Sequence, residues 1–168
     1  MGILEKMRLD GKASFVTGGA RGIGKAIAQA LAEAGSDLAL IDIDIEEAEK
    51  TAEAIEKKTG KKVIAVQADV TKPEDVEGMM KRIMEEFGHL DAAFCNAGIC
   101  MNVPAEEMTY EQWKKVIDIN LTGVFLTSQA AAKVMLTQGK GSIINTASMS
   151  AHIVNVPQPQ CSYNASKA

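Results

Sequence analysis

The 168-residue sequence lacks the features that mark several classes of protein. Its formal net charge of −4 is not the basic excess that nucleic-acid-binding proteins carry, so no nucleic-acid partner is expected. No apolar run approaches the roughly 18 residues that a membrane span needs. The N-terminal stretch MGILEKMRLDGK carries acidic residues and has no apolar secretory core. We therefore expect a cytoplasmic protein with no membrane partner.

Cysteine and histidine are also scarce, which bears on metal binding and redox chemistry. The three cysteines are Cys95, Cys100 and Cys161. Their number is odd and no two of them have CxxC spacing, so we expect free thiols in a reducing compartment. The two histidines, His89 and His152, are isolated in the sequence. We expect no metal site and assign neither histidine to catalysis.

Short apolar runs alternate with longer amphipathic segments along the chain. Strands are predicted at 13–18, 37–42, 62–69, 90–98 and 141–148, and helices at 22–35, 45–60, 71–88 and 109–138. Capping boxes are expected at Thr71 with Glu74 and at Thr109 with Gln112. The near-continuous apolar strands indicate burial on both faces. The pattern therefore predicts an α/β fold in which helices cover both sides of a parallel sheet.

A glycine-rich stretch, TGGARGIG at 17–24, joins the first predicted strand to the first predicted helix. Gly18 lets the chain turn off the strand. Gly22 and Gly24 are expected to remove side chains where the backbone approaches a pyrophosphate at the helix N-terminus. The spacing differs from G-x-G-x-x-G, and the Lys-Ser/Thr ending of a phosphate-transfer loop is missing. For this stretch alone, a structural turn is the alternative.

Asp42 closes the second predicted strand, 18 residues after Gly24. A carboxylate there can accept hydrogen bonds from both hydroxyls of an adenosine ribose, and its charge would repel a 2′-phosphate. Arg21 argues the other way, because a cation in the glycine loop could bind that phosphate. We give the carboxylate more weight and expect NAD in preference to NADP. Capping of the next helix is the alternative role for Asp42.

Every predicted strand ends on polar or glycine residues. These are Thr17 with Gly18, Asp42, Asp69, Asn96 to Gly98, and Ser148. Ligands of open α/β sheets bind outside the carboxyl ends of the strands. The five strand ends therefore indicate one shared crevice.

Five motifs follow one another along the chain: TGGARGIG, CNAG at 95–98, INLTG at 119–123, a serine closing the fifth predicted strand, and YNASK at 163–167. With this combination the whole chain resembles the short-chain dehydrogenase/reductase family. The resemblance implies a Rossmann-type doubly wound parallel sheet, a nicotinamide cofactor, and interconversion of an alcohol and a carbonyl compound. It also implies that residues 1–168 form a single NAD(P)-binding domain that is incomplete at its C-terminus, because family members continue well beyond the lysine.

The resemblance assigns roles to residues by position. Tyr163 would be the catalytic acid/base with Lys167 as its partner, Ser148 would hold the substrate oxygen, and Asn120 would complete a proton relay. The cofactor would be bound by Gly18, Arg21, Gly22, Ile23, Gly24, Asp42, Asp69, Val70, Asn96, Ala97, Gly98, Tyr163 and Lys167. Among these, Asp69 and Val70 would contact adenine, Asn96 to Gly98 would line the adenosine side, and Ile23 would lie near the nicotinamide.

The spacing of Tyr163 and Lys167 agrees with the chemistry of an acid/base pair. Residues four apart on a helix share a face, with Cβ atoms roughly 5–6 Å apart. Free tyrosine ionises only near pH 10, and a neighbouring ammonium favours the phenolate form. Without the other motifs, an ordinary surface contact would explain the pair. A buried structural amide would equally explain Asn120.

The sequence departs from the family pattern between the serine and the tyrosine. Ser148 and Tyr163 are 15 residues apart, wider than usual in the family, and Ser150 would restore the usual spacing. We favour Ser148 because it closes the strand. The SMSAHIVNVPQPQ segment resembles the polyol and sugar dehydrogenases of the family, so a sugar alcohol or another secondary alcohol is the expected substrate.

The sequence also leaves two alternative functions open, and the family resemblance implies an oligomeric state. The alternatives are reduction of 3-oxoacyl groups on acyl carrier protein with NADPH, and dinucleotide binding without turnover. The resemblance also implies a homotetramer for the full-length protein, built around the predicted helix from 109 and the one starting at 160. Trp113 and the apolar stripe of the 109–138 helix are read as core or as this interface.

Overall fold

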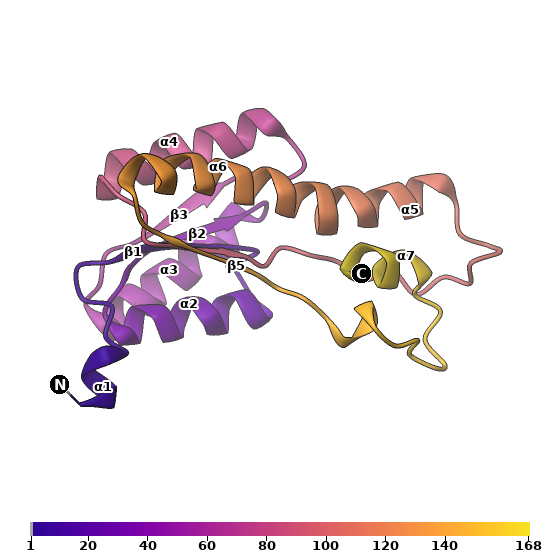
Figure 1. Ribbon diagram of the computed structural model, residues 1–168, viewed down its shortest axis with the longest axis horizontal. Coiled ribbons are helices and arrows are strands. Elements are labelled where there is room, and N and C mark those ends of the chain that lie inside the picture. The colour runs from indigo at the N-terminus through magenta and orange to yellow at the C-terminus, as the bar shows by residue number, and fades with distance from the viewer. Residues whose placement is uncertain (1) are drawn as a thin grey trace.

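A computed structural model describes residues 2–168, which form a five-stranded sheet between two helical layers (Figure 1). The strands are β1 (Ala13–Thr17), β2 (Asp37–Asp42), β3 (Val63–Gln67), β4 (Ala92–Cys95) and β5 (Ser142–Asn145), in the spatial order β3-β2-β1-β4-β5. All neighbouring strands are parallel, which confirms the predicted α/β class. The strand order reverses at β1, next to β4, and ligands of such sheets bind at this point.

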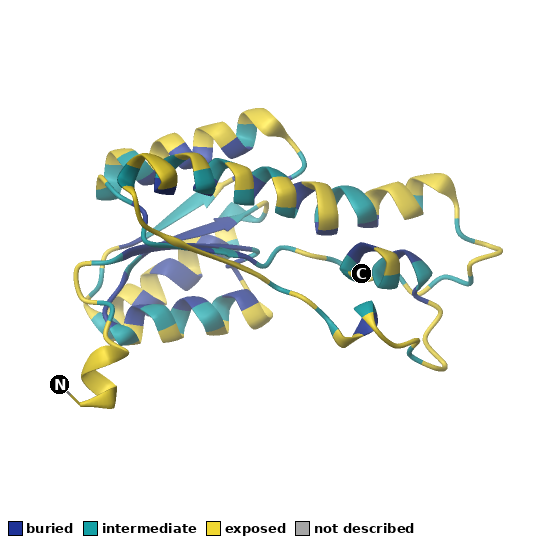
Figure 2. Cartoon of the chain, in the orientation of Figure 1, coloured by how far each residue is buried: buried dark blue, intermediate teal, exposed yellow. Residues whose placement is uncertain are grey.

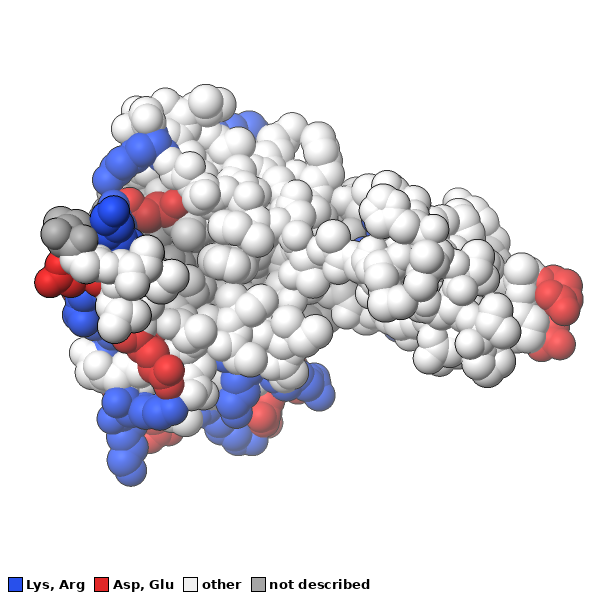
Figure 3. All heavy atoms as spheres, turned by 60° about the horizontal axis from the view of Figure 1, so that its bottom comes forward, with Lys and Arg blue, Asp and Glu red and all other residues white. Residues whose placement is uncertain are grey.

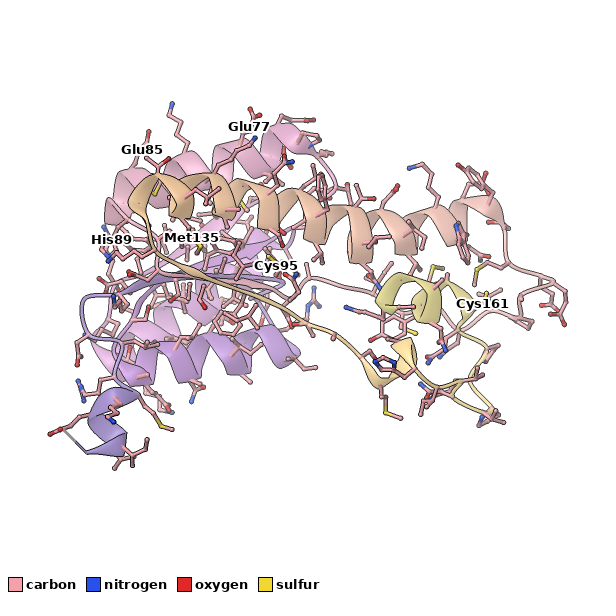
Figure 4. The ribbon with its side chains drawn as sticks, in the orientation of Figure 1. Glu77, Glu85, His89, Cys95, Met135 and Cys161 are labelled. Carbon is pink, nitrogen blue, oxygen red and sulfur yellow. The ribbon has the colours of Figure 1, made fainter. Side chains whose placement is uncertain are left out.

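Each face of the sheet has its own apolar core. Helices α2 (Gly22–Ala34) and α3 (Ile45–Thr59) cover one face, and α4 (Pro73–Phe87) and α6 (Gly123–Gln138) cover the other (Figure 1). Successive strand residues point to opposite faces, so Phe15 packs in the α4–α6 core and Val16 in the α2–α3 core. Met135 of α6 points down onto the sheet (Figure 4). A short helix, α1 (Ile3–Lys6), precedes β1.

The predicted helix over 109–138 forms, but it is not α-helical throughout. It consists of α5 (Tyr110–Ile117), a π-helical turn η1 (Asp118–Thr122), and α6. π-turns inside α-helices are rare and frequently lie at functional sites. The capping box at its start is confirmed. The backbone N–H of Gln112 donates to Thr109 Oγ1 (3.2 Å), and the backbone N–H of Thr109 donates to Gln112 Oε1 (2.9 Å).

The capping box predicted at Thr71 is wrong. Helix α4 begins at Pro73 with Lys72 in the N-cap position and no side-chain cap. The Thr71 hydroxyl instead donates to Asp69 Oδ1 at 2.7 Å. Thr71 therefore lies one residue outside the helix terminus, and its hydroxyl contacts the strand end and not the first turn of α4.

Burial on both faces, predicted for every strand, holds for β1 but fails for β5. All five residues of β1 are buried, whereas all four residues of β5 are exposed (Figure 2). β5 is the edge strand of the described sheet and pairs only with β4. The short loop after it leads to η2 (Met149–Ala151), and the chain then reaches α7 (Cys161–Lys167).

The amino ends of the strands carry a cluster of charges around Asp91, whose side chain is 11% exposed. Its carboxylate lies 3.0 Å from Lys12 Nζ and 3.3 Å from Lys140 Nζ, and it accepts the Ala13 amide at 3.1 Å. Figure 4 shows His89 at the same end, and Figure 3 shows most charged side chains of that view gathered there. Burial acts to raise the pKa of Asp91, but these hydrogen bonds outweigh it and hold the pKa below its ordinary value.

Replacing Asp91 by Asn is expected to lower the free energy of unfolding at pH 7 by about 1.5 kcal/mol, the scale of a charged hydrogen bond. A depressed carboxyl pKa stabilises the fold above the unfolded-state value of about 4 and ceases to do so as the pH falls through the folded value. The gap between wild type and variant should therefore close at low pH. Urea unfolding at pH 7 and pH 3 measures it, and a gap of constant size would contradict the role of the charge.

Candidate active site

The strand ends converge on one cavity of about 530 Å³. It is lined by twelve of the predicted site residues: Gly18, Arg21, Ile23, Gly24, Asp42, Asp69, Val70, Asn96, Ala97, Gly98, Tyr163 and Lys167. Residues 18–24 and 163–167 are distant in sequence and meet here because α7 lies beside the carboxyl ends of the strands (Figure 1). Gly22, Asn120 and Ser148 do not line the cavity. Lining residues that the sequence reasoning missed include Cys100, Ile119 and Thr146.

The glycine loop leaves the N-terminus of α2 open toward this cavity. Arg21 occupies the N-cap position without a side-chain hydrogen bond that caps the helix, and the first turn carries no acidic residue. The starts of α3 and α5 differ, because the Asp44 and Thr109 side chains cap them. A helix start with free N–H groups and the positive end of the helix dipole is suited to an anion. The α2 terminus therefore fits a phosphate group of a dinucleotide.

Contacts and backbone geometry within the protein add a second reason for two of the glycines. A Cβ on Gly24 would lie 2.0 Å from the Gly18 carbonyl oxygen and 2.8 Å from Asn96 Nδ2. Packing within the protein thus requires a glycine at this position, and its place beside a phosphate stays a prediction. Gly22 has a φ of +58°, and a Cβ there would meet no atom within 4 Å. Its left-handed backbone, which glycine adopts without strain, explains that residue.

Asp42 holds the glycine loop as well as facing the cavity. Its Oδ2 accepts the Ala20 amide at 3.0 Å, and its Oδ1 accepts the Asp44 amide at 3.1 Å. Asp44, not Asp42, caps α3 by accepting the Glu47 amide at 3.3 Å, so the alternative role for Asp42 is wrong.

The Arg21 guanidinium is paired on the protein itself. Its Nη2 lies 3.0 Å from Asp44 Oδ2, and both side chains are exposed. An exposed pair of this kind is weak, so Arg21 can be released at small cost. The loop cation and the β2 carboxylate therefore lie at the same rim of the cavity.

Residues at the ends of β1 and β3 shape the part of the cavity predicted to hold adenosine. Asp69 Oδ1 accepts the Thr71 amide at 3.0 Å. Burial acts to raise the pKa of Asp69, but the Thr71 hydrogen bonds outweigh it and lower the pKa. Thr17 Oγ1 accepts hydrogen bonds from the backbone N–H groups of Asn96 (2.9 Å) and Ala97 (3.0 Å), which connects β1 to the CNAG turn. This bridging role of Thr17 was not predicted.

Tyr163 and Lys167 both project from α7 into the cavity. Lys167 Nζ donates to the Thr146 carbonyl at 2.7 Å and lies 5.9 Å from the centre of the Tyr163 ring. The lysine is half-buried, and burial lowers its pKa. A carbonyl at the end of β5 therefore anchors the lysine nitrogen beside the phenol.

The two candidate serines have different surroundings. Ser150 is 5% exposed, and its Oγ accepts hydrogen bonds from two side-chain nitrogens, Asn155 Nδ2 (2.8 Å) and Gln160 Nε2 (3.3 Å). Ser148 is half-exposed, and its Oγ accepts the Ser150 backbone N–H at 3.1 Å. The Ser148 hydroxyl proton thus stays free to donate to a ligand. Ser150 is thus held by two side chains, while Ser148 is the more accessible hydroxyl, and the catalytic role of Ser148 stays a prediction.

Asn120 lies in the π-turn and is only 3% exposed. Its Oδ1 accepts the Ile99 amide at 2.8 Å, and its Nδ2 donates to the Ile99 carbonyl (2.9 Å) and to Ser166 Oγ (3.0 Å). The side chain thus joins the loop after β4 to α7. Tyr163 and Lys167 are not among its hydrogen-bonding partners, so its part in a proton relay stays a prediction.

The three cysteines are free thiols, as expected. Cys95 is buried beside the sheet and Cys161 lies at the start of α7 (Figure 4), while Cys100 is exposed at the cavity. Within residues 2–168, no three His, Cys, Asp or Glu side chains are grouped so that they could hold a metal ion. Over the same residues, no helix combines the length and apolarity of a membrane span.

The fold and the cavity agree with sequence comparison. A family model described as short chain dehydrogenase matches residues 12–168. The chain belongs to the short-chain dehydrogenase family. The resemblance seen in the five motifs is therefore confirmed, together with the Rossmann-type fold that it implied.

Three relatives place this short-chain dehydrogenase more closely. Sorbose reductase from Candida albicans is 39% identical in an alignment of 168 residues. The alignment covers 99% of this chain and 59% of the relative. An NADP-dependent mannitol dehydrogenase from Hypocrea jecorina is 38% identical, covering 99% of this chain and 64% of the relative. The crystal structure of an NAD⁺-bound xylitol dehydrogenase superposes with a TM-score of 0.88 at 36% identity, covering 95% of this chain and 60% of that one. The chain thus spans about 60% of the length of these relatives.

Proposed function

We propose that the protein is an NAD(P)-dependent oxidoreductase that interconverts a secondary alcohol, of the sugar-alcohol class, and a ketone. One observation carries the proposal: Tyr163 and Lys167 share a single cavity with the open α2 N-terminus and with Asp42. The cavity therefore combines an acid/base pair with groups suited to a phosphate and a ribose. The relatives named for sorbose, mannitol and xylitol support a polyol as the substrate class.

The chain's own residues would handle the proton of this reaction. When bound, the nicotinamide supplies the hydride acceptor or donor. Tyr163 takes the hydroxyl proton of the alcohol, and the Lys167 nitrogen, held by the Thr146 carbonyl at 2.7 Å, favours the phenolate when charged. Ser148 donates its free hydroxyl proton to the substrate oxygen. The open α2 terminus and Asp42 hold the phosphate and ribose ends of the dinucleotide.

The proposal is tested by turnover of the protein with NAD⁺ or NADP⁺ and a panel of sugar alcohols, followed through the absorbance of reduced nicotinamide. Oxidation of polyols faster than of simple primary alcohols is expected. Activity confined to 3-oxoacyl thioesters with NADPH would assign the protein to acyl-group reduction instead. Dinucleotide binding by calorimetry without any hydride transfer would leave a non-catalytic binder.

We infer a preference for NAD over NADP from the Asp42 carboxylate at the cavity rim. Asp42→Asn keeps an oxygen for the Ala20 amide and removes the charge that would repel a 2′-phosphate. NADP affinity is expected to rise about tenfold in this variant, a modest share of the Coulomb energy of two close charges. Calorimetric titration with both dinucleotides measures the change, with the exposed acid Glu53→Gln as a control. An unchanged ratio of the two affinities would reject the preference.

We further infer that the protein self-associates, as expected for a homotetramer of the full-length chain. Tyr110 (71% exposed), Leu121 (52%) and Phe125 (58%) are exposed along α5–α6, and Trp113 is also exposed. Other apolar residues of the same helices, Val116, Ala131 and Met135, are buried in the core. Exposed apolar side chains gathered on one element favour an interface. Sedimentation should give a mass above that of one chain, and a monomer at micromolar concentration would contradict the inference.

The free thiols support a reducing compartment such as the cytoplasm.

A further inference from the structure

Gln160 lies at the start of the catalytic helix α7, three residues before Tyr163, and is 8% exposed. It occupies the N-cap position, yet its side chain makes no capping hydrogen bond. Its Nε2 donates to Ser150 Oγ at 3.3 Å, and its Oε1 accepts the Cys100 thiol at 3.2 Å. A buried amide costs free energy unless it is hydrogen-bonded, and both ends of this one are used. The side chain therefore serves contacts across the site and not the helix terminus.

These contacts join three segments that surround the cavity. Cys100 belongs to the loop after β4 and lines the cavity, and Ser150 belongs to the η2 turn after β5. The backbone next to Gln160 reinforces the junction, because the Pro159 carbonyl accepts the Val103 amide at 2.8 Å. One buried side chain thus fixes the loop after β4 and the loop after β5 against the first turn of α7.

The junction continues directly to the candidate catalytic serine. The backbone N–H of Ser150 donates to Ser148 Oγ at 3.1 Å, while the Ser150 side chain is held by Gln160 and Asn155. Ser148 is therefore oriented by a residue that Gln160 holds, and Gln160 itself precedes Tyr163 on the same helix turn. A shift of the η2 turn would move the serine away from the phenol, although the Gln160 side chain forms its hydrogen bonds with Ser150 and Cys100 and not with either of them.

We propose that Gln160 is a positioning residue, which sets the serine–tyrosine geometry of the active site through Ser150 and Cys100. The expected effect on catalysis rests on the proposed function, whereas the positioning itself rests on the hydrogen bonds of Gln160 to Ser150 and Cys100. Misplacement of a reacting group by about 1 Å costs on the order of 100-fold in rate. The effect should fall on the chemical step with polyol, and dinucleotide binding should stay intact because Gln160 contacts neither the glycine loop nor Asp42 through a hydrogen bond.

The test uses Gln160→Met, which keeps the side-chain length and removes both hydrogen bonds. The variant is expected to lower kcat for a polyol about 10- to 100-fold while the dinucleotide Kd changes less than about twofold. Ser150→Ala should lower kcat similarly, and the double variant should be no worse than the poorer single one, because the two act through one contact. Gln158→Met, an exposed glutamine of the same loop, is the matched control and should keep the wild-type rate.

A second readout does not depend on turnover. Loss of the Gln160 oxygen frees the Cys100 thiol, so labelling of Cys100 by a thiol reagent, located by mass spectrometry, should quicken in Gln160→Met and not in Gln158→Met. Unchanged kcat, additive losses in the double variant, or an equal loss of dinucleotide binding would overturn the proposal. If wild type binds dinucleotide without turnover, the proposed function fails, and the Cys100 labelling rate then decides: an unchanged rate rejects the junction, and a faster one supports it.

Discussion

Replacement of Tyr163 by Phe is expected to lower hydride transfer about 1000-fold, within the range that a positioned acid or base contributes. The substitution removes only the hydroxyl. The ring that lies 5.9 Å from Lys167 Nζ and the wall of the cavity are kept. The alcohol then has no group to take its proton as the hydride leaves. Dinucleotide affinity should change by less than about fivefold, because one neutral hydrogen bond is worth about 1 kcal/mol.

Rates of nicotinamide reduction with a polyol, measured together with calorimetric binding of the dinucleotide, separate the two effects. The chain offers a matched control in Tyr110, its only other tyrosine, which is 71% exposed. Tyr110→Phe should keep the wild-type rate. A Tyr163→Phe variant that retained more than about a tenth of the activity would remove the tyrosine from the acid/base role.

The second large effect is expected at Gly24, where replacement by Ala should abolish dinucleotide binding. The added Cβ would lie 2.0 Å from the Gly18 carbonyl oxygen, so the backbone of the glycine loop must move. A carbonyl of the backbone cannot rotate aside as a flexible side chain can. We expect the dinucleotide Kd to rise at least about 100-fold and the free energy of unfolding to fall by about 3 kcal/mol, as for an overpacked interior site.

The same substitution at Gly78 provides the control. Gly78 lies within α4, is exposed, and would place a Cβ in open space. Gly78→Ala should raise the free energy of unfolding by about 0.5 to 1 kcal/mol through helix propensity and leave dinucleotide binding unchanged. Urea unfolding and calorimetry on both variants test the pair. Full binding by Gly24→Ala would show that the loop adapts and that its close packing is not required.

The fold class and the location of the site followed from the sequence because both depend on local patterns. Apolar runs such as 13–17 and 37–42 alternate with amphipathic helices, and this alternation allows only a parallel sheet covered on both faces. Carboxyl ends of parallel strands lie on one edge, so polar residues there had to meet. The four-residue spacing of Tyr163 and Lys167 likewise places them on one helix face wherever α7 lies.

The roles of several single residues were decided by the backbone geometry of the folded chain. The sequence allowed Asp42 to cap α3, but the cap is Asp44, and Asp42 holds the Ala20 amide. Thr71 was expected to cap α4, but its hydroxyl donates to Asp69 Oδ1, and α4 begins one residue later than a cap at Thr71 requires. These outcomes depend on which of several nearby donors and acceptors come within about 3 Å of one another, and sequence spacing does not set that distance.

The sequence by itself therefore determined an α/β architecture of the Rossmann type and the placement of a tyrosine and a lysine on one helix face. Only the tertiary structure decided that Ser150 is buried while Ser148 keeps a free hydroxyl, and that Gln160 joins the loops around them. The physical reason is the range of the forces involved. Periodicity and helix spacing act within one segment, whereas the contacts of Gln160 bridge residues up to 60 positions apart that meet only after the sheet has formed.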